Sequence, residues 1–358
     1  MNFELSEEQQ LLQQTVRKFL DNECPTTHIR AVFEGETGFD PALWKGMVEM
    51  GLAGLHLPDT FGGAGLEMID LALVSEALGW GGAPGPFLGH ALAGLAILLA
   101  GSDEQKQRWL PRLAAGDALA TIAFDEAGGL WQPEDWALEA GRKLTGSKVN
   151  VPFASFADVF VVGVGGGGLA LVEKSAGGIE IRSMEGVDRG RRIDRVRFEG
   201  TPAEALPKGV EASPRVRDAG LVLLAADAFG AGSRLLDLCV KYAKTREQFG
   251  VTIGHFQALK HQLANMALEI EPARALYWYA AHAFDHIPKQ APRSAALAKA
   301  HLTDRAMQIA RDAVEAHGGI GFTWECDVQL WFKRVMFDRA FLGIPSVHRE
   351  RAAKLAGW

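Results

Sequence analysis

The residue types with the clearest chemistry lie in one short string, TREQFGVTIGHFQ, at 245–257. Arg246 stands at the end of a predicted helix, Phe249 and Gly250 form a predicted turn, and a second helix begins near Gln257. Arginine offers paired donors to phosphate oxygens and a helix N-terminus offers backbone N–H groups, so the string suits a dinucleotide diphosphate. On chemistry alone, a capped helix–turn–helix with a surface arginine is at least as good an interpretation.

Other reactive side chains form no site that can be read from their spacing. Cys24, Cys239 and Cys326 are far apart and make no CxxC, which excludes a disulfide framework and a zinc ribbon. His282 and His286 have a chelating i, i+4 spacing, but no HExxH glutamate accompanies them and a proline follows at once. A solvated helix end is the better interpretation of that pair, and we expect no metal site.

The composition predicts a globular protein of the cytoplasm. Of 358 residues, 48% are apolar and 23% are charged, which excludes disorder as the main state. The net charge is 37 − 44 = −7, so the basic footprint of a nucleic-acid-binding protein is missing. The first residues, MNFEL, have no basic or apolar region typical of a signal peptide, and the apolar stretch 91–100 is too short to span a bilayer. We expect neither nucleic acid nor membrane as a partner.

Hydrophobic periodicity predicts three segments that could position these residues. Residues 1–116 form an N-terminal α-helical domain, 117–210 a middle antiparallel β-domain, and 211–358 a C-terminal four-helix bundle. Strands are predicted at 157–164, 169–172, 179–181 and 195–198, with the glycine run 165–168 as a hairpin tip. Bundle helices are predicted at 221–246, 256–270, 294–317 and 328–355, the last with interruptions near Gly343 and Pro345. The fold class is therefore α+β multidomain.

The string at 245–257 resembles the flavin-binding signature of the acyl-CoA dehydrogenase family. Further matches run through the chain in order: PDTFGGAG at 58–65, EALG at 76–79, GSDEQK at 101–106, LPRLAAGD at 110–117, LTGSK at 144–148 and HGGIGFTWE at 317–325. The resemblance implies the acyl-CoA dehydrogenase fold and an FAD-dependent α,β-dehydrogenation of an acyl-CoA thioester. In that family a carboxylate removes the α-proton while the β-hydride moves to the flavin, and a flavoprotein accepts the electrons.

The resemblance also implies which residues bind FAD. In this family the cofactor lies at a subunit interface, and the arginine motif reaches across to the FAD of a neighbour, so an oligomer is expected. Carried over position by position, the cofactor-binding residues are Arg246, Gln248, Phe249, Ile253, Phe256, Gln257, Glu315, Gly318 and Gly319. Glu315 stands where the family usually has glutamine.

The catalytic base of the family has no counterpart at either of the two positions where the resemblance places it. Its usual glutamate, in a Tyr-Glu-Gly-Thr-like string, falls on Leu342. The alternative position, at the start of the helix leading into the arginine motif, falls on Gly220, with only Asp218 nearby. Neither leucine nor glycine can accept a proton, so we expect no catalytic residue from these two positions.

The flavin-ring contacts of the β-domain also depart from the family. Its Thr-Glu-Pro becomes Asp125-Glu126-Ala127, which puts an anion in place of a hydroxyl donor and repels a reduced, anionic flavin. Its aromatic-Ile-Thr/Ser segment becomes Asn150-Val151-Pro152, and proline offers neither hydroxyl nor N–H.

This asymmetry resembles the shorter, base-lacking subunit of heterotetrameric acyl-CoA dehydrogenases of bacterial steroid side-chain β-oxidation. The hypothesis is that a second dehydrogenase subunit supplies the base and flavin cradle. Two alternatives stay open: a self-sufficient homo-oligomer whose base is Asp125, Glu126, Asp218 or Asp338, and a structural or binding paralogue without redox chemistry.

Overall fold

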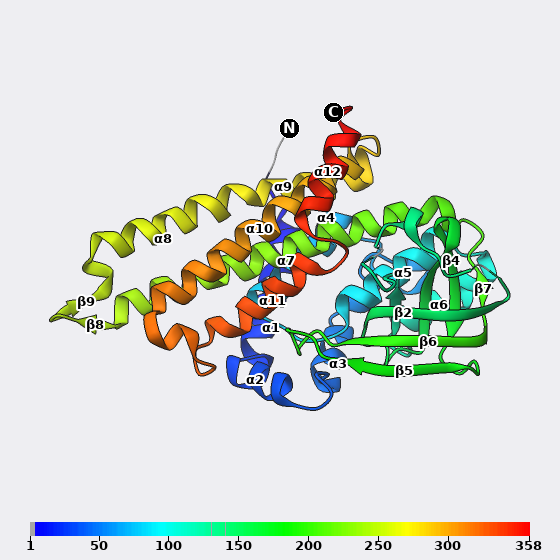
Figure 1. The fold of residues 1–358 in the computed structure, drawn as a ribbon, viewed down its shortest axis with the longest axis horizontal. Helices are drawn as coiled ribbons and strands as arrows, with labels where there is room; N and C mark the ends of the chain where they lie inside the picture. The colour runs from blue at the N-terminus through cyan, green and yellow to red at the C-terminus, as the bar shows by residue number, and fades with distance from the viewer. Residues whose placement is uncertain (1–3, 130, 140) are drawn as a thin grey trace. The chain divides into compact units, whose positions relative to one another are not determined.

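The computed structural model describes residues 4–129, 131–139 and 141–358. The α-helices are α1 (Glu7–Glu23), α2 (Thr26–Glu34), α3 (Pro41–Glu49), α4 (Met68–Gly81), α5 (Phe87–Ala100), α6 (Asp103–Ala114), α7 (Gly209–Thr245), α8 (Gln257–Ile270), α9 (Arg274–His286), α10 (Ala291–His317), α11 (Val328–Ala340) and α12 (Pro345–Leu355). The strands are β1 (Ala120–Ala123), β2 (Lys143–Pro152), β3 (Val159–Val164), β4 (Gly168–Glu173), β5 (Ile179–Met184), β6 (Ile193–Pro202), β7 (Glu204–Ala205), β8 (Glu247–Gln248) and β9 (Val251–Thr252). Figure 1 shows this order along the ribbon.

The chain divides into two compact units, each built from segments distant in sequence. Unit 1 contains Met1–Ala31, Ala72–Ala83 and Leu221–Trp358, and unit 2 contains Val32–Leu71 and Pro84–Gly220. Helices α8 to α12 and the part of α7 from Leu221 onward thus belong to unit 1, and both sheets of the β-domain belong to unit 2.

Unit 2 is organised around two small sheets. One has the order β1-β3-β4-β7 and the other β2-β6-β5. All their pairings are antiparallel except β1 with β3, which is parallel. In β6 the side chains of Val196 and Phe198 are buried while Arg195 and Arg197 are exposed, as the two-residue period of a half-buried strand requires.

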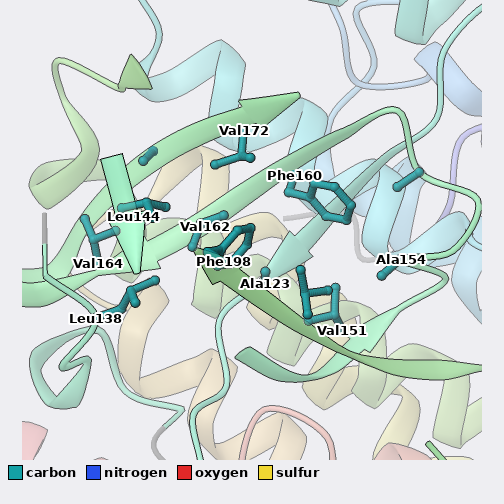
Figure 2. Packing of buried hydrophobic residues seen from close by; sticks show 13 residues of the cluster. Ala123, Leu138, Leu144, Val151, Ala154, Phe160, Val162, Val164, Val172 and Phe198 are labelled. Carbon is teal, nitrogen blue, oxygen red and sulfur yellow. The ribbon is translucent and has the colours of Figure 1, made fainter. Parts of the chain in front are cut away.

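The core of unit 2 combines apolar side chains from both sheets. Phe160 and Val162 of β3 lie with Val151 of β2 and Phe198 of β6 in one cluster, and each is at most 1% exposed (Figure 2). Because one cluster takes its members from both sheets, the sheets pack on each other as a sandwich.

Unit 1 is a helical bundle built around α7. An Arg334–Asp227 ion pair joins α11 to α7 with N···O distances of 2.7 and 2.5 Å, and both side chains are buried. A Cβ at Gly230 would lie 2.0 Å from the carbonyl oxygen of Glu76, so α4 and α7 touch at a position that only glycine fits. By length and apolar composition α7 could cross a membrane, but its apolar stretch is mostly buried, as in the core helix of a globular bundle.

The predicted elements agree with the structure in most places. The predicted strands correspond to β3–β6, and the glycines at 165–168 do connect β3 to β4. The predicted helix 328–355 is two helices, which separate at the interruption expected near Gly343 and Pro345. Sequence reasoning passed over α9 and over β1, a short run without alternation whose residues are all buried. The boundaries at 116/117 and 210/211 remain a prediction.

Candidate functional site

The arginine string forms a tight β-hairpin between the end of α7 and the start of α8. Strand β8 pairs with β9 in antiparallel register, with Gln248 opposite Val251. The two turn residues have positive φ, +56° at Phe249 and +78° at Gly250, which is the backbone of a type I′ turn. Glycine adopts this conformation freely, whereas a left-handed phenylalanine costs about 1–3 kcal/mol. The turn therefore retains an aromatic residue against its backbone preference.

The side chains of this hairpin point away from the bundle core. Phe249 is 91% exposed and meets Phe256, which is 38% exposed, edge to face at 6.2 Å. Arg246 is also exposed, although its backbone is fixed by hydrogen bonds with Tyr242 and Ile253, both 2.8 Å. Within 4–129, 131–139 and 141–358, its guanidinium makes no ion pair or side-chain hydrogen bond. Its donors are thus available to an anion.

The predicted residues around Arg246 share this open, basic surrounding. Gln257 is the exposed first residue of α8, and the exposed Gln248 donates to the Glu247 carbonyl at 2.7 Å. Lys244 and Lys260 are exposed and form no ion pair with any residue that the structure describes. Three exposed cations, Lys244, Arg246 and Lys260, thus accompany a single exposed acid, Glu247, along the string where a diphosphate is expected.

The second predicted motif follows α10 and begins the short 3-10 helix η7 (Gly318–Phe322). Gly318 has φ +64° and ψ −144°, a combination that side chains other than glycine avoid. A Cβ at Gly318 or Gly319 would meet no heavy atom within 4 Å among the described residues, so this backbone is open to a ligand.

Two contacts bring the motifs to one end of the bundle. The His317 ring stacks on Tyr242 of α7 at 4.5 Å and 21°, and its Nδ1 lies 2.8 Å from the Ala313 carbonyl oxygen. Gln262 of α8 donates to Glu315 of α10 at 3.4 Å. Burial lowers the pKa of His317 against the opposing Ala313 hydrogen bond, which favours a neutral ring there. Figure 1 shows β8 and β9 at the same end as the C-terminus of α10.

We call the exposed side chains of this end the motif surface. It consists of Arg246, Phe249, Phe256, Ile320 and Phe322. Ile320 is 47% and Phe322 76% exposed, so the aromatic turn is accompanied by two further apolar side chains. Exposed apolar groups gathered beside basic ones are typical of a surface that another molecule covers.

In the β-domain, Glu126 is held inside a polar cluster. It accepts hydrogen bonds from the Ala137 and Leu138 amides at 3.0 Å and from Lys148 Nζ at 2.6 Å. The Lys148 side chain is fully buried. Burial opposes ionisation of Glu126, but Lys148 and these amides outweigh it and keep its pKa below the usual range. Glu126 is therefore a bound anion that fixes the segment around residue 137.

The neighbouring Asp125 pairs with Asn150 of β2. Asn150 has φ +53° and donates to Asp125 Oδ2 at 2.5 Å. Burial raises the pKa of Asp125 to about 6, while the Asn150 hydrogen bond opposes that rise. The two positions at which the family contacts the flavin ring are thus joined to each other. Among the described residues no donor reaches Asp125 Oδ1. An aspartate at position 125 and a proline at position 152 stand where the resemblance expects hydroxyl donors, so these positions do not match a flavin cradle.

The two family positions for the base carry no acid. Leu342 is fully buried with φ +57°, and its carbonyl lies 2.9 Å from His348 Nε2. Gly220 is buried in α7. Of the other carboxylates considered, Asp218 accepts from Arg217 at 3.1 Å, and Asp338 is fully buried on α11. Both carboxylates are buried in the interior of the fold.

The remaining reactive groups are buried or scattered. All three cysteines are buried and unbridged, and burial raises the pKa of Cys239 to about 12, which disfavours a thiolate. No group of three or more His, Cys, Asp or Glu that could hold a metal ion occurs among the described residues.

Sequence reasoning missed the partners that define several of these residues. Lys148 was considered only as part of the LTGSK match at 144–148, and Asn150 only as a lost aromatic residue. Arg30 was not considered, although it contacts Trp324, Glu325 and Asp327 beside the second motif. These partners lie far apart in sequence, so no local pattern announces them.

Comparisons with known proteins agree with the motifs. Residues 6–117 match the acyl-CoA dehydrogenase N-terminal domain and residues 218–356 the C-terminal domain. Acyl-CoA dehydrogenase IpdE2 of Mycolicibacterium smegmatis is 34% identical over 98% of both chains. A variant of the Tcur3481–Tcur3483 steroid ACAD has a TM-score of 0.90 at 31% identity, over 98% of both chains.

A further solved structure is a complex of two named components. The ChsE4–ChsE5 complex from Mycobacterium tuberculosis gives a TM-score of 0.89 at 25% identity, covering 100% of this chain and 99% of the other. These findings confirm the resemblance and the fold class. The chain belongs to the acyl-CoA dehydrogenase family of FAD-dependent oxidoreductases.

Proposed function

We propose that this chain is the base-lacking subunit of a hetero-oligomeric acyl-CoA dehydrogenase. A second, base-bearing dehydrogenase subunit seats the flavin ring, and this chain completes FAD binding from outside. The observation that carries the proposal is the contrast between an exposed, unpaired Arg246 with open glycines beside it and a β-domain in which Asp125 and Glu126 are already bound within the fold.

The residues of the motif surface fit the cofactor chemically. Arg246 would hold the diphosphate with its paired donors, with Gln248 and Gln257 as further polar contacts. Phe249 would cover an apolar face of the cofactor or of the partner, and the open backbone at Gly318 and Gly319 admits close approach. When bound, FAD supplies the hydride acceptor for α,β-dehydrogenation. This chain's residues bind and orient it and exclude water.

Deprotonation of the thioester is assigned to the partner. Leu342 cannot accept a proton, and Glu126 is neutralised by Lys148. Asp218 pairs with Arg217, and Asp125 pairs with Asn150. A base must reach the substrate carbon in its ionised form, and none of these carboxylates is both free and at a family position.

The similar proteins support the class of substrate and partner. One similar structure is described as a steroid ACAD and another as a two-component complex, which favours an acyl-CoA with a bulky ring system and a hetero-oligomer. We further propose that a flavoprotein accepts the electrons and that the complex works in the cytoplasm.

Arg246→Ala tests the proposal, with Arg293→Ala as a control because Arg293 is an exposed arginine at the start of α10, the end of that helix opposite His317. We expect Arg246→Ala to lose FAD from the complex while the isolated chain keeps its thermal unfolding temperature, since the guanidinium has no partner among the described residues. Arg293→Ala should retain the FAD. Full FAD occupancy and activity in the Arg246→Ala complex would contradict the assignment.

Purification of the chain alone separates the alternatives. A yellow protein that reduces a dye with an acyl-CoA would support the self-sufficient homo-oligomer. A protein without flavin even beside every candidate partner would support the paralogue without redox chemistry.

A further inference from the structure

Arg30 of α2 contacts the last residues of the second motif and Asp327, which follows it. Its Nη1 donates to the Trp324 carbonyl, and its Nη2 donates to the Glu325 carbonyl at 3.2 Å and to Asp327 Oδ1 at 2.8 Å. The guanidinium carbon also lies 4.9 Å from the centre of the Trp324 ring. One side chain thus holds three consecutive parts of a loop almost 300 residues away in sequence.

The residues contacted by Arg30 closely follow the open segment Gly318–Phe322. Its other end is fixed by His317, which stacks on Tyr242 and contacts the Ala313 carbonyl. In its middle, Gln329 donates to the Gly321 carbonyl at 2.6 Å. The Gly318 N–H donates to the Glu315 carbonyl at the end of α10, but a Cβ built at Gly318 or Gly319 would meet no heavy atom within 4 Å among the described residues, and glycine backbones are the most mobile when side chains do not restrain them. The conformation of the segment therefore depends on a few hydrogen bonds and on the anchors at its two ends.

The contacts of Arg30 require the shape of a guanidinium. A planar fork can donate to two carbonyls and a carboxylate while its face lies on an aromatic ring, and an ammonium cannot do all of this at once. The side chain is only 19% exposed, so water replaces these contacts poorly. A lysine at position 30 would keep the positive charge, but it could not make all of these contacts and so would not fix the loop.

We propose that Arg30 is a positioning residue for FAD binding: from the N-terminal helices it fixes the Gly318–Phe322 segment in the conformation that meets the cofactor. This rests on the proposed function, because it assumes that the segment contacts FAD held with the partner subunit. The role differs from that of Arg246, because Arg30 acts through the loop and does not touch the cofactor.

The test compares Arg30→Lys and Arg30→Gln with Arg108→Lys. Arg108 is a matched control because it also pairs with a carboxylate, Glu204 at 2.8 Å, and lies 5.7 Å from a tryptophan ring. In the isolated chain, we expect amide hydrogen exchange at 318–327 to rise about tenfold in both Arg30 variants and to stay unchanged in the control. In the complex with the base-bearing subunit, both Arg30 variants should bind FAD about tenfold more weakly than wild type. This binding is measured at a temperature well below the unfolding temperature of the variants.

Each result decides the matter. Unchanged exchange at 318–327, or raised exchange with wild-type FAD affinity, overturns the positioning role of Arg30. If Arg246→Ala loses FAD while the Arg30 variants keep it, the proposed function stands and only this inference fails. If the wild-type complex binds no FAD, or Arg246→Ala binds it normally, the proposed function fails and takes this inference with it.

Discussion

The substitution Glu126→Gln tests whether Glu126 stabilises the fold or acts as the catalytic base. Glutamine keeps the size of the side chain but removes the charge that Lys148 Nζ meets at 2.6 Å. Lys148 is left with the Phe124 carbonyl at 3.3 Å and no solvent exposure. Removing one partner of a buried ion pair costs about 3–5 kcal/mol. That is a large part of the 5–15 kcal/mol by which a domain is typically stable, so the variant should be severely destabilised.

The assay is urea unfolding of the isolated chain, followed by circular dichroism. Glu204→Gln is the control, since Glu204 pairs with Arg108 at 2.8 Å but is half exposed, and such a pair contributes about 0–1 kcal/mol. Replacing both buried partners, as Glu126→Leu with Lys148→Met, should recover most of the lost stability. A Glu126→Gln protein as stable as wild type but without dehydrogenase activity would refute this reasoning and identify Glu126 as the base.

Three further changes test other parts of the structure. Burial, reinforced by their mutual repulsion, lowers the pKa of His56 to about 3, and burial lowers that of His90 to about 4. Both rings are therefore neutral in the folded protein, whereas they take up protons near pH 6.5 when the chain is unfolded. The free energy of unfolding should fall by about 2 kcal/mol per histidine between neutral pH and pH 5, measured by urea unfolding at each pH. A free energy of unfolding that does not change over this range contradicts the prediction. Phe249→Asn should stabilise the type I′ turn by about 1 kcal/mol yet weaken FAD binding, measured by thermal unfolding and flavin titration, and unaltered flavin binding would exclude the aromatic ring from the site. Leu342→Glu should lower the free energy of unfolding by at least about 2 kcal/mol because it buries an unpaired acid, and wild-type stability in urea would show that the position can reach solvent.

The sequence predicted the exposed site residues of the hairpin better than the buried residues of the β-domain. The string at 245–257 contains its own signals, namely an arginine after a helix, a Phe-Gly turn and a following helix, because the hairpin forms between near neighbours. The strands β3 to β6 were predictable for the same reason, since alternation and glycine turns are local patterns.

Long-range partners could not be predicted in this way. The lost hydroxyl at Asp125 could be seen in the sequence, but its pairing with Asn150 depends on how β2 passes the end of β1. Likewise, Glu126 remained a candidate base until the buried Lys148 appeared beside it. Arg30 and Trp324 meet because the chain up to Ala31 packs in the same compact unit as Leu221–Trp358.

Flavin content is the most direct test of the central claim. The chain is purified alone and together with each acyl-CoA dehydrogenase subunit encoded near it, and FAD and dye reduction with an acyl-CoA are measured per chain. The account predicts little FAD and no activity in the isolated chain, and both in one co-purified complex that contains fewer FAD molecules than chains. Stoichiometric FAD and turnover in the isolated chain would contradict it.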